Sequence, residues 1–156
     1  MNGSLGVAAG LGAVTGLRSM LALAWVSREL HGRRRRYRRP RRLESWLGDA
    51  VVSRALTALA AGELIADKLP AVPERIQPGS LVGRQAIGAL LGAVAAGQDC
   101  RWAGAAVGAS AALAGSVLGY WLRREAVRAT LLPDAAIALV EDAITLAATR
   151  ELATEL

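Results

Sequence analysis

Residues 102–122 read WAGAAVGASAALAGSVLGYWL, an uncharged run with glycine at positions 104, 108, 115 and 119. A run of this length can cross the ~30 Å hydrocarbon core of a bilayer as one helix. Glycines four residues apart form a flat strip on one helix face, which lets a neighbouring backbone approach closely. The stretch therefore predicts a transmembrane helix that packs through small residues.

The composition of the whole chain agrees with this prediction. Of its 156 residues 53% are hydrophobic, yet only 4% are aromatic, no Phe is present, and 17 residues are Gly. Alanine supplies most of the apolar share and buries too little area to drive strong collapse in water. Helices in lipid instead associate by close approach, which small residues allow. The composition favours a membrane protein over a soluble one.

Four more apolar segments accompany the first, at residues 5–26, 47–69, 81–97 and 134–152. Ala and Leu dominate them and alternating β-branched runs are absent, so we expect helices and no strands. The last segment starts with Asp134 after Pro133, a typical helix start. Further glycine pairs at the same spacing are Gly6/Gly10, Gly12/Gly16 and Gly88/Gly92. We expect an all-α polytopic bundle of about five hydrophobic segments, forming a single integral membrane domain over residues 1–156.

A basic run separates the first two segments. Residues 33–42 read RRRRYRRPRR, and removing these eight of 19 basic residues leaves 11 against 13 acidic ones. Basic loops stay cytoplasmic and contact anionic lipid headgroups. With Tyr37 as its only aromatic residue, the run lacks a platform for nucleic acid. We expect a cytoplasmic loop at about 28–45 whose headgroup contacts are Arg33, Arg34, Arg35, Arg36, Arg38, Arg39, Arg41 and Arg42.

The orientation that this loop imposes creates a conflict further along the chain. If every segment crosses fully, Arg123, Arg124 and Arg128 lie outside, against the preference of basic residues for the cytoplasm. The conflict disappears if one intervening segment, most simply 81–97, enters the membrane and returns without crossing. Re-entrant or broken helices are tolerated where protein or a water-filled cavity covers the backbone.

Charged residues inside the apolar segments are the candidate site. They are Arg18 in the first segment, Glu63, Asp67 and Lys68 near the end of the second, Arg84 at the start of the third, and Glu141 and Asp142 in the last. A charge at mid-bilayer costs roughly 2.5–3.5 kcal/mol, so such residues should pair and face inward. Two interpretations stay open: substrate or ion binding, or a structural ion pair of Arg18 with Glu141 or Asp142 that locks the bundle.

Polar residues occupy two faces of the last segment. Asp142 shares one face with Thr145 and Thr149, and Glu141 shares another with Asp134 and Thr145. One helix cannot hide both faces from lipid unless it is central or lies at a subunit contact. We therefore expect an internal polar cavity, a homo-oligomer with a dimer favoured, or both.

These motifs resemble a bacterial membrane family catalogued as domain of unknown function 4126. The most specific part is E-x-x-A-D-K-x-P at residues 63–70, and Gly16-x-Arg18, Arg84-x-x-x-Gly88-Ala89 and Glu141-Asp142 add to it. A Pro associated with the residues after Arg18 is absent here, and the Arg run looks like an insert. The resemblance implies a multi-pass fold in the bacterial cytoplasmic membrane, and it supplies no activity.

The two halves of the chain also show a weak similarity that suggests an internal repeat, because each half has a Gly-Arg step followed by an acidic pair. In transporters built from repeats, broken helices meet at a central site. We expect a transporter, channel or flippase for a small ion, anionic solute or lipid. The alternative is a membrane scaffold or partner subunit whose ion pairs are structural. One His and one Cys without nucleophile–base spacing make an enzyme the weakest option, and no cofactor or metal is expected.

Overall fold

The computed structural model describes residues 2–34, 42–66, 77–130 and 134–156. These residues form seven helices and no strand, which confirms the all-α prediction. The helices are α1 (Asn2–Leu17), α2 (Ser19–Arg34), α3 (Arg42–Leu47), α4 (Ala50–Ala66), α5 (Pro78–Ala96), α6 (Arg101–Ala129) and α7 (Asp134–Thr154).

Helices α1, α5 and α6 pack most closely with one another, and glycine sets their distance. A Cβ atom added to Gly12 would collide with the backbone of Gly108, and one added to Gly92 would collide with Gly104. Gly108 also faces Gly88, so α6 has α1 on one side and α5 on the other. Only residues without a side chain allow backbones this close, so the glycine strip fixes the centre of the fold.

Four of the five glycine pairs behave as predicted. Those beginning at Gly12, Gly88, Gly104 and Gly115 all lie against a neighbouring backbone or side chain. The fifth pair is different: Gly10 faces the side chain of Leu152, while a Cβ at Gly6 would meet nothing within 4 Å. The packing prediction is therefore confirmed, except at Gly6.

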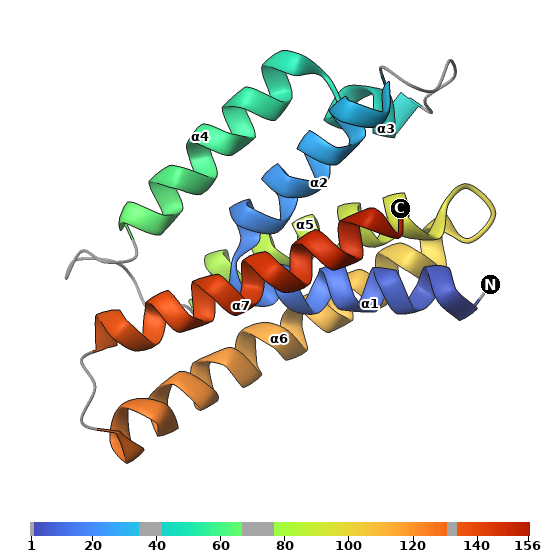
Figure 1. The fold of residues 1–156 in the computed structure, drawn as a ribbon. Helices are drawn as coiled ribbons and strands as arrows, with labels where there is room; N and C mark the ends of the chain where they lie inside the picture. The colour runs from blue at the N-terminus through green and yellow to red at the C-terminus, as the bar shows by residue number, and fades with distance from the viewer. Residues whose placement is uncertain (1, 35–41, 67–76, 131–133) are drawn as a thin grey trace.

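The predicted first segment, residues 5–26, is not one helix. It breaks at Arg18, and α2 turns back toward the end of the molecule where α1 begins (Figure 1). Contacts with α7 show the reversal: α1 runs antiparallel to α7, with Gly10 at Leu152 and Arg18 at Asp142, whereas α2 returns along α7 until Arg33 reaches the carbonyl of Thr154. The prediction of a single span was wrong here, and the broken helix is in the first segment, not the third.

Several chain segments gather at one end of the bundle, which we name the basic end. Arg33 near the end of α2 donates a hydrogen bond to the carbonyl of Thr154 at 2.9 Å, and Gly10 of α1 lies against Leu152. The turn at residues 97–100 and helix α3 lie at this end too (Figure 1). We name the opposite end of the bundle the far end. It holds the last turns of α4 and α6 and the first turns of α5 and α7 (Figure 1).

Helix α5 runs without interruption from the far end to the basic end, antiparallel to α6. The expectation that segment 81–97 enters and returns is therefore wrong. Gly83 and Arg84 lie inside this continuous helix, whereas Gly16 and Arg18 lie at a helix break. The two Gly-Arg steps of the suggested repeat are therefore not structurally equivalent. Arg123 and Arg128 lie at the far end, opposite Arg33, so the conflict over basic residues persists.

Helices α2, α3 and α4 form an arm beside the central bundle (Figure 1). The hydroxyl of Ser27 donates to the carbonyl of Leu47, and the ring of His31 hydrogen-bonds the carbonyl of Gly48 at 2.8 Å. These bonds fix the end of α3 against α2, and α4 then returns along α2. The loop predicted at about 28–45 is helical at both edges, and residues 35–41 lie outside the described part.

In the described part of the chain, α5 and α6 are the two helices long and apolar enough to cross a membrane. Large apolar side chains are also exposed on the outer faces of α6 and α7: Leu113, Val117, Leu118, Trp121, Leu122, Leu139, Val140, Ile144 and Leu146. A soluble monomer rarely exposes so much apolar surface. Both observations indicate membrane association.

Candidate functional site

The break at Arg18 is the centre of the candidate site. In a continuous helix the amide of Met20 would donate to the carbonyl of Gly16, four residues earlier. The helical pattern of α1 reaches the amide of Arg18, which donates to Val14 at 2.9 Å. Beyond it the Met20 amide and the Gly16 carbonyl both bond to other helices, so two backbone groups of one helical turn are redirected.

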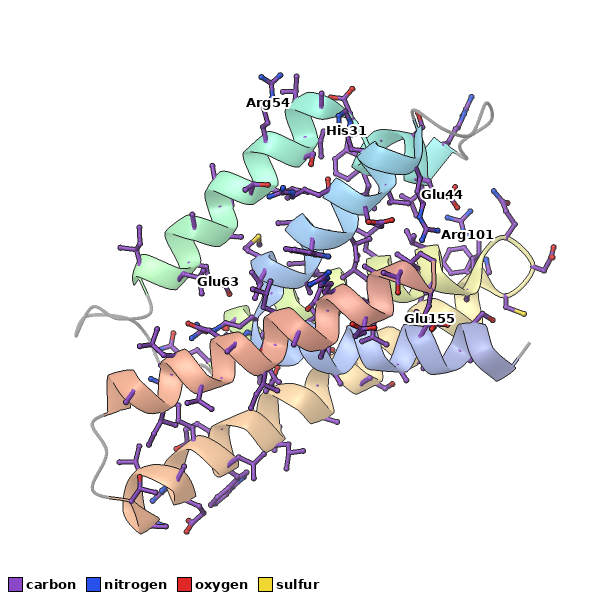
Figure 2. All side chains as sticks on the ribbon, viewed as in Figure 1. His31, Glu44, Arg54, Glu63, Arg101 and Glu155 are labelled. Atoms are coloured by element: carbon purple, nitrogen blue, oxygen red, sulfur yellow. The ribbon has the colours of Figure 1, made fainter. Side chains whose placement is uncertain are left out.

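Glu63 of α4 binds the amide side of the break. Its carboxylate accepts hydrogen bonds from the Met20 amide and the Ser19 hydroxyl, both at 2.9 Å. A carboxylate at this position satisfies the first amides of α2 and opposes the positive end of its dipole. Figure 2 shows Glu63 near the far end of α4. It therefore joins the arm to the break.

Arg84 of α5 binds the carbonyl side. Its Nη1 donates to the Gly16 carbonyl at 2.7 Å, and the Ser116 hydroxyl of α6 lies 3.1 Å from the same oxygen. The Ser116 proton is shared with the Ala112 carbonyl at 2.8 Å. A cation at the last carbonyls of α1 opposes the negative end of its dipole. Arg84 is 9% exposed, so this bond is formed away from solvent.

Arg18 itself pairs with Asp142 of α7. The Nε atom lies 2.6 Å from Oδ1, and the two side chains are 2% and 14% exposed. The ion pair expected for Arg18 is present, and Asp142 rather than Glu141 is its partner. Removing one member of such a pair leaves an uncompensated buried charge. The pair therefore connects α7 to the break.

Glu141 points to a different neighbour. Its Oε2 lies 3.6 Å from Nη1 of Arg123 on α6, and both side chains are mostly buried. The two residues line a cavity of about 240 Å³ between α6 and α7, together with Leu17 and Gly119. Arg18 and Asp142 are not among the residues that line this cavity. Leu17 and Glu141 directly precede Arg18 and Asp142 in the sequence. The cavity therefore touches the residue before each member of the ion pair, but not the pair itself.

The polar residues of α7 whose side chains are described have neighbours within one chain on both faces. Thr145 and Thr149 are fully buried, and Glu141 and Asp142 point to α6 and α1. The reason for expecting a subunit contact at these faces therefore does not hold, and the dimer stays a prediction without it.

The predicted site residues divide into three groups. The structure brings Arg18, Glu63, Arg84 and Asp142 together at the break and places Glu141 beside them. Asp67 and Lys68 lie outside the described residues. Ser19, Ser116 and Arg123 were not predicted as site residues. The only signal for Ser116 was its place inside the Gly115/Gly119 strip.

The headgroup candidates are partly described. Arg33 pairs with Glu29 at 3.1 Å and binds the last carbonyls of α7, which is a structural role at the basic end. Arg34 ends α2, and Arg42 begins α3 with an exposed side chain. Arg35, Arg36, Arg38, Arg39 and Arg41 lie outside the described residues.

The chain matches the family described as "Domain of unknown function (DUF4126)" over residues 5–150. It belongs to this family. Comparison with curated proteins and with solved structures gave no match.

Five of the residues that carried the family resemblance meet at the break. Gly16 supplies the carbonyl, Arg84 binds it, Glu63 binds the opposite amide, and Arg18 pairs with Asp142. They come from helices α1, α4, α5 and α7, so the motifs are scattered in sequence but joined in space. The Arg run that looked like an insert begins at the end of α2 and ends at the first residue of α3, and residues 35–41 between them lie outside the described part.

Proposed function

We propose that α4, α5, α6 and α7 cross a membrane and that the basic end faces the cytoplasm. Trp102 and Trp121 of α6 are nineteen residues apart, which is about 28 Å along a helix. This separation matches the ~30 Å hydrocarbon core, at whose edges Trp is enriched. Arg33 and Arg42, which begin and end the Arg-rich run, lie at the Trp102 end, and this supports the cytoplasmic assignment by the positive-inside rule.

In this arrangement α1 and α2 form a re-entrant pair. The 16 residues of α1 span about 24 Å, less than the full core, and α2 returns to the side from which α1 enters. Irregular backbone is tolerated in a bilayer where protein covers it. At the Arg18 turn Glu63, Arg84 and Ser116 provide that cover.

The depth of the break follows from its neighbour on α6. Ser116, which binds Gly16, is five residues from Trp121 and fourteen from Trp102. These separations are about 7 Å and 21 Å at ~1.5 Å per residue. The break therefore belongs to the outer third of the hydrocarbon, and Arg123 belongs near the outer headgroups.

We infer that this protein is a small transporter or channel for an anionic solute or a small ion, and that the break at Arg18 is its binding site. The carrying observation is one interrupted helix whose two ends are bound by Glu63 and Arg84. Transporters use half-helix termini at such interruptions to bind ions and anionic groups. Arg18 and Arg84 supply positive charge for an anion, and Glu63 and Asp142 supply counter-charges. A lipid flippase is the variant of this proposal for a larger substrate.

A second candidate is a non-transport scaffold or partner subunit. The observation that favours it is the Arg18–Asp142 pair, which is direct and almost completely buried. A pair of this kind can have a purely structural role, which is to hold α1 and α7 together. In that case the charges can be replaced by apolar residues of similar size without loss of activity in the cell.

Proteoliposomes separate the two candidates. Vesicles with wild-type protein should release chloride or phosphate faster than empty vesicles, and Arg18→Met/Asp142→Leu should abolish the difference while keeping the helical circular dichroism spectrum. Arg124→Gln is the matched control, because Arg124 is exposed and distant from the break. Wild-type release equal to that of empty vesicles, or full release by the double variant, would reject transport through the break.

A further inference from the structure

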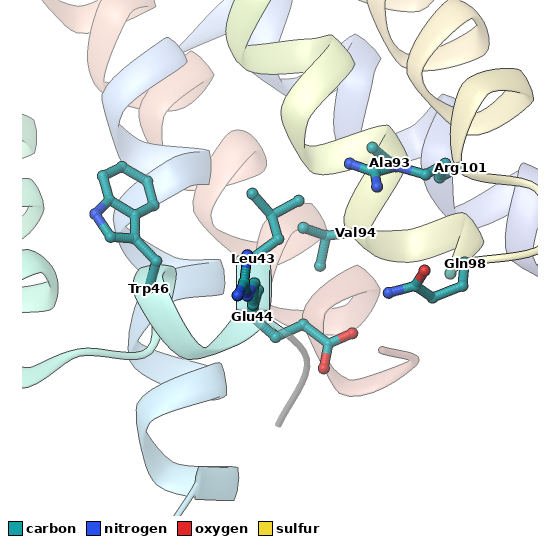
Figure 3. A pocket seen from close by; sticks show the side chains of 9 residues that line it. Leu43, Glu44, Trp46, Ala93, Val94, Gln98 and Arg101 are labelled. Atoms are coloured by element: carbon teal, nitrogen blue, oxygen red, sulfur yellow. The ribbon is translucent and has the colours of Figure 1, made fainter. Parts of the chain in front are cut away.

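A second cavity lies at the basic end, away from the break. It has a volume of about 460 Å³ and is open between α3, the last turn of α5 and the start of α6 (Figure 3). Its lining residues are Arg42, Leu43, Glu44, Trp46, Ala93, Val94, Gly97, Gln98 and Arg101. The volume is within the ~300–1,000 Å³ range of small-molecule sites.

The lining of this cavity is divided by chemistry. Leu43, Ala93 and Val94 form an apolar wall, while Arg42 and Arg101 bring two cations from parts of the chain far apart in sequence. Figure 3 shows side chains of α3 on one side of the cavity and those of α5 and Arg101 on the other. A ligand that satisfies both parts needs an anionic group and an apolar chain.

The cations lie at the level where phospholipid headgroups are expected. The Arg101 guanidinium lies 5.4 Å from the ring centre of Trp102, which is 80% exposed, and Trp46 on α3 is also exposed. Exposed Trp of this kind is enriched at the membrane interface. A phosphodiester at this depth would meet both Arg side chains, with its acyl chains directed toward the membrane core.

The polar residues Glu44 and Gln98 restrict which lipid headgroup the cavity can accept. Both line the cavity beside the two cations, and a carboxylate there disfavours a ligand that carries only negative charge. It can accept a hydrogen bond from an ammonium or hydroxyl group on the same ligand. The cavity therefore suits a phosphate ester that carries its own donor group.

We propose that this cavity binds one phospholipid of the ethanolamine class, with its phosphate between Arg42 and Arg101 and its ammonium group at Glu44. The bound lipid would join α3 to the α5–α6 turn. The proposal uses the membrane placement given above, but it does not require transport at the break.

Delipidated full-length protein in detergent micelles tests the proposal by native mass spectrometry with dihexanoyl phosphatidylethanolamine. Arg101→Gln should weaken binding about fivefold or more, as expected for the loss of one cationic contact. Arg124→Gln should bind like wild type. It is a matched control because Arg124 is equally paired with an exposed Trp, Trp121 at 5.7 Å, at the far end.

Two more measurements test whether the lipid binds in this cavity and whether the ligand is a lipid. Ala93→Trp fills the cavity without a change of charge and should also abolish binding, which keeps the test valid if Arg101→Gln is unstable. Glycerophosphoethanolamine has the headgroup without acyl chains and should bind at least tenfold more weakly. Equal binding of this headgroup would reject a lipid site, and equal lipid binding by wild type, Arg101→Gln and Ala93→Trp would reject the cavity.

Discussion

The carboxylate of Glu63 and the guanidinium of Arg84 bind opposite sides of one helix break, Glu63 at the Met20 amide and Arg84 at the Gly16 carbonyl. Each charge opposes the dipole of the helix end that it touches. The two residues come from α4 and α5, which are consecutive in the chain but contact the break from different directions. The interruption is therefore built into the fold by its neighbours.

Replacing Glu63 should open the amide side of the break. Glu63→Ala leaves the Met20 amide and Ser19 hydroxyl without their acceptor and should lower the free energy of unfolding by about 1–3 kcal/mol. Glu63→Gln keeps one acceptor oxygen and should cost less. Hydrogen exchange at the Met20 amide should be faster in Glu63→Ala than in Glu63→Gln, and equal rates in both variants and wild type would contradict this assignment.

The Arg18–Asp142 pair should show strong coupling. Arg18→Met or Asp142→Leu alone leaves one buried charge and should destabilise the protein by roughly 3–5 kcal/mol. The double variant should recover most of that loss, because neither charge remains. Thermal unfolding in detergent, followed by circular dichroism, measures the three variants. Additive losses would show that the two side chains do not interact in the folded protein.

Glycine positions should differ in their tolerance of a single methyl group. Gly108→Ala adds a Cβ against the Gly88 backbone and should destabilise the protein by about 1–3 kcal/mol through overpacking. Gly83→Ala is the matched control in α5, where a Cβ meets nothing within 4 Å. It should be neutral or stabilising, because Ala favours helix over Gly by about 1 kcal/mol. Similar melting temperatures for the two variants would mean that α5 and α6 pack differently.

Cysteine labelling should report the orientation of the two ends. The chain has one Cys, Cys100, in the turn at the basic end. In cells, a membrane-impermeant maleimide should label Cys100 only after the membrane is permeabilised. Arg124→Cys in a Cys100→Ser background should be labelled in intact cells. The reverse pattern would place the basic end outside, and labelling of both sites in intact cells would reject the proposed crossings.

The sequence predicted which residues form the site better than it predicted how they meet. Arg18, Glu63, Arg84 and Asp142 stood out because charges in apolar segments are costly, and all four gather at the break. The reversal of the chain at Arg18 was missed. Residues 16–20 contain no Pro, and their own preferences allow a continuous helix. The bonds that replace the helical ones come from residues 43 to 100 positions later, which a local pattern does not reveal.

Charge and spacing were poor guides at two other positions. Arg123 follows the uncharged run 102–122 and was considered only for the orientation of the chain, but α6 continues to Ala129, so Arg123 lies on the helix and reaches Glu141. Gly6 has the same spacing as the glycines that pack, yet no neighbour lies over it. Spacing identifies a flat strip on a helix, but the length of the partner decides how much of that strip is covered.

The position of Arg18 also constrains the order in which the protein is assembled. Helix α1 leaves the ribosome before the groups that bind its end, Arg84, Ser116 and Asp142, are synthesised. The glycine surface that receives α1 is likewise on α5 and α6. The α1–α2 hairpin is therefore translated before the helices against which it docks, and the charge of Arg18 needs shelter at the membrane interface or in the insertion machinery until α7 is synthesised.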